Sequence, residues 1–128
     1  MIRYLTVAML TLILTCAAAM ASPPESPTRP LSPDEQQYFR GLMEPSGHQS
    51  CCDLSECRMV EYRQNNKLGF YEFMARNGRD EFSFKDGDNH WHAVPANKIL
   101  RSENPTGKAV ACWSHRLGVL CFNLPAMI

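Results

Sequence analysis

Residues 50–57 read Ser-Cys-Cys-Asp-Leu-Ser-Glu-Cys and place three of the six cysteines of the chain within eight positions. A zinc site would favour cysteine pairs two to four residues apart that recur elsewhere in the chain. The later cysteines, Cys112 and Cys121, instead lie singly within expected strands, and no Cys-x-x-Cys redox pair is present. The pattern therefore favours disulfide bonds over a metal or redox centre.

The first 21 residues have the organisation of a secretory signal peptide. A basic start at residues 1–3 is followed by an apolar run over 4–16, and Ala19-x-Ala21 precedes Ser22. The apolar run is too short to predict a membrane span. We expect cleavage after Ala21, export to the periplasm or the medium, and no membrane span in the mature chain.

Cleavage would leave 107 of the 128 residues, with 12 basic side chains, 13 acidic side chains and five cysteines. This near-neutral balance offers no basic surface for nucleic acid. A chain of this length buries only a modest core as one domain, and disulfides stabilise such domains in an oxidising compartment.

The mature chain begins with a proline-rich segment, residues 22–31, which we expect to be a disordered tether. A single globular domain is expected over 32–128. It opens with a helix over 33–43, because Ser32 and Glu35 form a capping box and Pro33 suits the first helical position.

Beyond the helix, the apolar pattern changes to the period of two that is typical of strands. We expect a mainly β, α+β domain with one N-terminal helix, in which a small antiparallel sheet curls into a disulfide-stapled barrel or SH3-like roll. The expected strands span residues 58–63, 69–75, 80–85, 90–94, 108–114 and 118–123.

The dipeptide Asn77-Gly78 is the strongest hairpin signal in the chain. A two-residue turn there would set Phe73 opposite Phe82 and Tyr71 opposite Phe84. Residues 86–89 would form the next turn, and we read their resemblance to part of a calcium loop as turn chemistry. The predicted core consists of Tyr71, Phe73, Phe82, Phe84, Trp91, Val94, Val110, Cys112, Leu120 and Phe122.

Strand alternation then directs His90 and His92 away from the core face that holds Trp91. Two histidines at this spacing can bind copper or zinc, so a periplasmic metal-handling protein is an alternative function. No third ligand stands at a diagnostic spacing, so we favour a solvated strand face as the explanation of the pair.

The disulfide candidates are Cys51, Cys52, Cys57, Cys112 and Cys121. Five cysteines predict two bonds, with the fifth cysteine either a buried thiol or an intermolecular link, and the sequence leaves the connectivity open. A turn at Arg116-Leu117 would place Cys112 directly opposite Cys121, where a cross-strand bond is feasible.

The cysteines, turns and aromatic residues form a pattern that is similar to small exported proteobacterial proteins of unassigned function. This resemblance implies a periplasmic location and no particular activity. The residues that carry it are Cys51-Cys52-Asp53, Cys57-Arg58, Trp91, Val94-Pro95, Asn104-Pro105-Thr106-Gly107, Ala111-Cys112-Trp113 and Cys121-Phe122.

No catalytic constellation stands out in the sequence, so we expect a non-catalytic module without a cofactor that binds a protein partner in the cell envelope. An unrecognised enzyme is the alternative from a different class. The candidate partner-binding side chains are Arg76, Arg79, Trp113 and Arg116, because arginine and tryptophan dominate binding interfaces.

Overall fold

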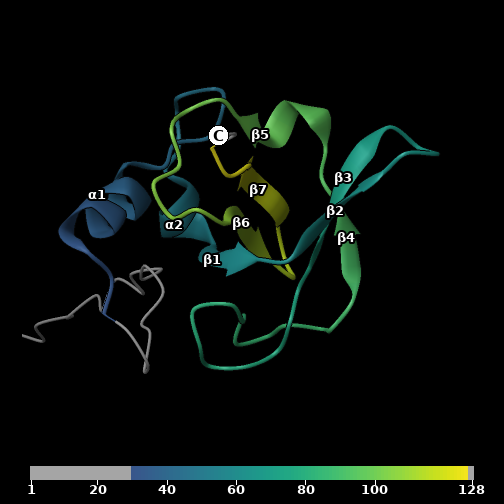
Figure 1. The fold of residues 1–128 in the computed structure, drawn as a ribbon, viewed down its shortest axis with the longest axis horizontal. Helices are drawn as coiled ribbons and strands as arrows, with labels where there is room; N and C mark the ends of the chain where they lie inside the picture. Colours follow the sequence, from purple (N-terminus) through teal and green to yellow (C-terminus); the bar gives the residue numbers. More distant parts are fainter. Residues whose placement is uncertain (1–29, 127–128) are drawn as a thin grey trace, which may run out of the picture.

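The computed structural model describes residues 30–126, apart from the side chains of Asp53 and Leu54. The expected signal peptide and residues 22–29 of the expected tether lie outside this range. Figure 1 shows the arrangement in layers, with two helices on one side of a central sheet and a smaller sheet on the other side.

The helices are α1 (Pro33–Gly41), α2 (Cys51–Leu54) and the 3₁₀-helix η1 (Ala96–Lys98). The strands are β1 (Glu56–Val60), β2 (Tyr62–Asn65), β3 (Phe70–Met74), β4 (Trp91–Ala93), β5 (Ile99–Leu100), β6 (Ala109–Ser114) and β7 (Gly118–Asn123). The mainly β, α+β and disulfide-stapled prediction is confirmed. The strands form two separate sheets and not one closed barrel.

Helix α1 begins with the predicted capping box. The Glu35 carboxylate accepts from the Ser32 backbone N–H at 2.8 Å, and the Ser32 hydroxyl accepts from the Glu35 N–H at 3.2 Å. The helix ends at Gly41, two residues earlier than predicted, because Leu42 adopts an extended conformation. This lets the Leu42 carbonyl accept from the Cys51 N–H at 2.9 Å, which joins α1 to the start of α2.

The central sheet has the strand order β1-β6-β7-β5, and all its pairs are antiparallel except β5 with β7. Five consecutive residues of β6, from Ala109 to Trp113, are buried. One face of the sheet packs against Phe39 and Leu42 at α1, and the other packs against Phe73 of the second sheet. A strand covered on both faces needs apolar residues at every position, which explains the unbroken apolar run of β6.

The second sheet has the antiparallel order β2-β3-β4. Phe73 lies in its middle strand, opposite Tyr62 on β2 and His92 on β4. Residues that are directly opposite in an antiparallel pair share a face, so His92 lies on the same face as Phe73 and points toward the core. Trp91 lies on the other face, where the Arg63 guanidinium stacks over its ring at 4.0 Å.

The predicted hairpin at Asn77-Gly78 is therefore wrong, and so is the placement of Trp91 and His92 on the sheet faces. The expected strand over 80–85 is not formed, because β3 pairs with β4 and residues 75–90 become a long connection between them. Phe82, which was predicted to face Phe73, lies on this connection.

Most of the predicted core is confirmed. Seven of the predicted residues are buried, and Tyr71, Phe82 and Trp91 are only half-buried. The buried ones are Phe73, Phe84, Val94, Val110, Cys112, Leu120 and Phe122.

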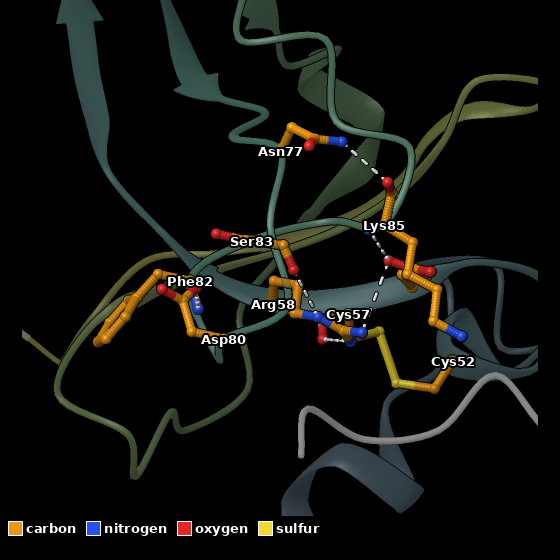
Figure 2. Close-up of polar contacts among 9 residues, drawn as sticks. Cys52, Cys57, Arg58, Asn77, Asp80, Phe82, Ser83 and Lys85 are labelled. Carbon is orange, nitrogen blue, oxygen red and sulfur yellow. Dashed lines mark hydrogen bonds and ion pairs between the residues drawn. A yellow bond between two sulfur atoms is a disulfide. The ribbon is translucent and has the colours of Figure 1, made fainter. Parts of the chain in front are cut away.

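The connection covers the outer edge of β1. The Arg58 guanidinium donates to the Ser83 carbonyl at 2.8 Å, as Figure 2 shows. The Lys85 N–H donates to the Glu56 carboxylate at 3.0 Å. The Met59 N–H also donates to the Glu81 carbonyl at 3.1 Å. An uncovered edge strand invites pairing with another chain, so these contacts shield the sheet.

Two glycine-to-alanine variants test the packing of this connection. A Cβ on Gly87 would overlap the Arg76 carbonyl and lie 2.6 Å from the Asn77 nitrogen, whereas a Cβ on Gly41 meets nothing within 4 Å. We expect Gly87→Ala to destabilise the fold by about 1–3 kcal/mol, and Gly41→Ala to stabilise α1 by about 0.5 kcal/mol. Urea unfolding measures both, and equal midpoints for the two variants would contradict the tight packing at Gly87.

Candidate functional site

Cys51 and Cys121 form a disulfide that joins α2 to β7, with a Cα–Cα distance of 6.0 Å. Cys112 lies directly opposite Cys121, as predicted. The predicted two-residue turn at Arg116-Leu117 is wrong, because Ser114 pairs with Gly118 and an irregularity between Cys112 and Trp113 shifts the register by one. The cross-strand bond between Cys112 and Cys121 is not formed, because Cys121 is bonded to the helix that packs against its face of the sheet. The sequence could not show this, as it depends on where α2 packs.

Cys52, Cys57 and Cys112 form a second group, called here the cysteine trio. Their three Sγ atoms all lie within 4.8 Å of one another, and all three residues are buried. Cys57 makes disulfide contacts with both Cys52 and Cys112. A sulfur atom forms only one disulfide bond, so these contacts are alternatives and one sulfur of the trio remains a thiol. The expected count of two bonds and one thiol stays a prediction.

Within residues 30–126, the trio is the only group of three or more His, Cys, Asp or Glu side chains close enough to hold a metal ion. Its surroundings are apolar, with Phe39, Leu42 and Met59 in the same cluster. A metal held by the trio would require up to three thiolates at once, and an apolar site disfavours that much buried negative charge. A neutral disulfide with a neutral thiol suits this site better.

The two histidines of the predicted metal site have different surroundings. His90 is exposed, whereas the half-buried His92 ring stacks on Phe73 and its Nε2 contacts the Asp88 carboxylate at 2.8 and 3.0 Å. This ion pair occupies one of the two nitrogens with which His92 would bind a metal. Copper or zinc binding by His90 and His92 stays a prediction.

The pKa of Asp88 reflects this pair. Partial burial alone would raise the pKa, but the His92 hydrogen bond, the His90 N–H and the charges of both imidazoles outweigh it and lower the pKa below 3.8. A lowered folded-state pKa means that the contribution of Asp88 to stability is present above about pH 4 and is lost as the pH falls through the folded value.

The candidate partner-binding residues do not form one surface patch in the fold. Arg76 and Arg79 lie on the connection between β3 and β4, and Arg116 lies in the turn between β6 and β7. These three arginines are exposed, but Trp113 is only 4% exposed and packs against Phe84 with ring centroids 5.3 Å apart. Trp113 is therefore a core residue, because β6 is covered on both faces.

A groove of about 760 Å³ lies between α1 and the segment that runs from β5 to Pro105. Its apolar lining comes from Tyr38, Leu42, Met43, Leu100 and Pro105. Two carboxylates, Asp34 and Glu103, also line it. Asp34, Met43 and Glu103 are exposed, so the groove is open to solvent.

Buried polar contacts fix the walls of this groove. The Asn123 amide donates to the Tyr38 hydroxyl at 3.0 Å and to the Ser102 carbonyl at 3.2 Å. Burial raises the pKa of Tyr38 to about 12, although the hydrogen bond with Asn123 lowers it. Asn104, which is 4% exposed, donates to the Lys108 carbonyl at 2.6 Å. Tyr38 is thus neutral up to strongly alkaline pH, and it ties α1 to β7.

Sequence reasoning missed the groove. Asn104 was recognised only as part of a turn, and Tyr38 and Leu42 fell within the expected helix over 33–43 without a role of their own. The groove forms where three segments that are separate in the sequence come together: residues 34–43, residues 100–105 and Ala126. A local sequence pattern does not predict such a tertiary contact.

Comparisons with known proteins give no match to a family model, a curated protein or a solved structure. In the part of the chain that the structure describes, no helix is long and apolar enough to cross a membrane. The disulfides indicate that the protein folds in an oxidising environment outside the cytoplasm.

A double variant tests the staple between α2 and β7. The disulfide closes a loop of 70 residues, so replacing Cys51 and Cys121 by alanine should cost about 4 kcal/mol in unfolding free energy. Cys52→Ala is the matched control, because it also removes a buried sulfur and still leaves Cys57 a partner. A loss no larger than that of the control in urea unfolding would show that the staple contributes little.

Proposed function

We propose that this protein is an exported, non-catalytic binding module that takes an extended segment of an envelope protein into the groove beside α1. The segment would carry apolar side chains together with lysine or arginine. The groove itself, with its apolar walls and its two carboxylates, is the single observation that supports this proposal.

The size of the groove fits a short segment. A volume of about 760 Å³ lies within the usual range for ligand sites, roughly 300–1,000 Å³, and would accommodate a few side chains. A large flat surface for a folded partner would instead need an exposed hot-spot cluster, and the burial of Trp113 removes the aromatic anchor predicted for one.

The charge of the groove favours a cationic segment. Asp34 and Glu103 contribute carboxylates, and none of the described residues that line the groove is lysine or arginine. Complementary charge steers the approach of a partner and rejects like-charged ones more than it adds affinity. The apolar walls would then supply most of the binding free energy.

Export is the second part of the proposal. The disulfides support an oxidising compartment, and the signal-like sequence of residues 1–21 supports a route to the periplasm. Expression of the full chain in a proteobacterial host, followed by intact-mass analysis of the periplasmic fraction, should give a chain that begins at Ser22. A chain that keeps residues 1–21 in the cytoplasmic fraction would contradict export.

NMR titration tests the groove. The probe is a synthetic peptide of alternating leucine and lysine with blocked ends, and the matched control replaces lysine by glutamate. We expect the lysine peptide to shift the backbone amides of Gln37, Gly41, Leu100 and Glu103, which all line the groove. The glutamate peptide should shift none of them.

Gly41 offers a matched pair of variants for this titration. A Cβ at this position meets no atom within 4 Å, so a side chain there has room to extend along the groove. Gly41→Trp should therefore fill the groove and weaken peptide binding at least tenfold, whereas Gly41→Ala should leave binding unchanged. Equal binding by both variants, or shifts that fall outside the groove, would refute the proposed site.

A further inference from the structure

We propose that the cysteine trio is an intramolecular thiol–disulfide exchange site, in which Cys57 exchanges partners between Cys52 and Cys112. The exchange changes which cysteine keeps the thiol: Cys112 on β6 or Cys52 on α2. This inference concerns a site separate from the one used for binding, and it does not depend on the proposed function.

Both pairings are reachable without rearranging the fold. The Cα atoms of Cys52 and Cys57 are 5.7 Å apart, within the range usual for disulfides, about 4.4–6.8 Å. Cys57 and Cys112 are directly opposite on neighbouring antiparallel strands, with their Cα atoms 4.0 Å apart. This distance lies just below that range, so small backbone adjustments suffice to move from one pairing to the other.

The fold holds all three sulfurs together whichever bond exists. The β1–β6 register keeps Cys57 beside Cys112, and the bond from Cys51 to Cys121 anchors the helix that carries Cys52. The attacking thiol is therefore always present at a high effective concentration, which accelerates an intramolecular reaction.

The exchange step balances without an external oxidant or reductant. Starting from the Cys52–Cys57 bond, the Cys112 thiol loses its proton and the thiolate attacks Cys57 Sγ. The bond from Cys57 to Cys112 forms as the bond from Cys57 to Cys52 breaks. Cys52 leaves as a thiolate and takes up a proton, so the molecule holds one disulfide and one thiol in the trio before and after.

Among the described residues, two charged side chains of β1 lie close to Cys57. The Arg58 guanidinium donates to the Cys57 carbonyl at 2.8 Å, and Figure 2 shows it next to the Cys52–Cys57 bond. Its positive charge favours the thiolate that the reaction needs. The Glu56 carboxylate, 3.5 Å from the same guanidinium, offsets part of this charge.

The two arrangements differ in tryptic mass, which makes the exchange measurable. Trypsin places Cys51, Cys52 and Cys57 on peptide 41–58, Cys112 on peptide 109–116 and Cys121 on peptide 117–128. With a Cys52–Cys57 bond, peptide 109–116 is released alone. With a Cys57–Cys112 bond, all three peptides stay linked. Cys16 falls on a different tryptic peptide, so a label or a disulfide on it is recognised by the mass of that peptide.

The test incubates the oxidised full chain at pH 8, blocks thiols with N-ethylmaleimide and maps the unreduced digest. We expect two products, with the label on Cys112 in the released peptide and on Cys52 in the linked one. A single labelled position would overturn the proposal. Labels on all three residues of the trio would also overturn it and would favour a site of three thiols.

Two single variants keep the result interpretable. Cys52→Ser should yield only the Cys57–Cys112 bond, and Cys112→Ser only the Cys52–Cys57 bond, with near-UV circular dichroism confirming that each variant is folded. A folded Cys52→Ser protein in which Cys57 and Cys112 both react with N-ethylmaleimide would overturn the exchange. If either variant fails to fold, the labelling of the unsubstituted chain still shows whether Cys57 exchanges between Cys52 and Cys112.

Discussion

The central sheet is buried on both faces, and the rest of the fold depends on this. Strand β6 lies in its middle, where five successive side chains are removed from water. Neither face is stable unless another layer covers it, because exposed apolar area is unfavourable. The helices cover the face of Cys112 and Val110, and the second sheet covers the face of Ala111 and Trp113.

Local signals predicted the elements that do not depend on distant partners. The capping box fixed the start of α1. The hairpin of β6 and β7 was also predicted, although a register shift between Cys112 and Trp113, and not the turn alone, sets Cys112 opposite Cys121. The hairpin predicted at Asn77-Gly78 does not form, because β3 already pairs with β2 on one side and with β4 on the other. The connection from β2 to β3 contains Gly69, which has a positive φ of 71°. Pairing on both sides of β3 outweighed the turn propensity of Asn77-Gly78. As a result, Trp91 and His92 lie on the sheet faces opposite to those predicted.

The candidate sites show the same division between local and long-range information. All five described cysteines were identified from the sequence, because oxidation chemistry depends on residue type and compartment. Their partners could not be identified, because Cys51 meets Cys121 only after α2 packs on the sheet. The groove was invisible for the same reason, since Tyr38, Leu100 and Pro105 are far apart in the chain.

Leu42 links the two candidate sites physically. Its side chain belongs to the same buried cluster as Cys52 and also lines the groove. Its carbonyl accepts from the Cys51 N–H at 2.9 Å, so the first residue of α2 is fixed to the residue after α1. Exchange at Cys57 alternately binds and releases the sulfur of the next residue of α2, Cys52. A packed interior transmits such displacements to its neighbours, so Leu42 is the residue through which exchange in the trio would reach the wall of the groove.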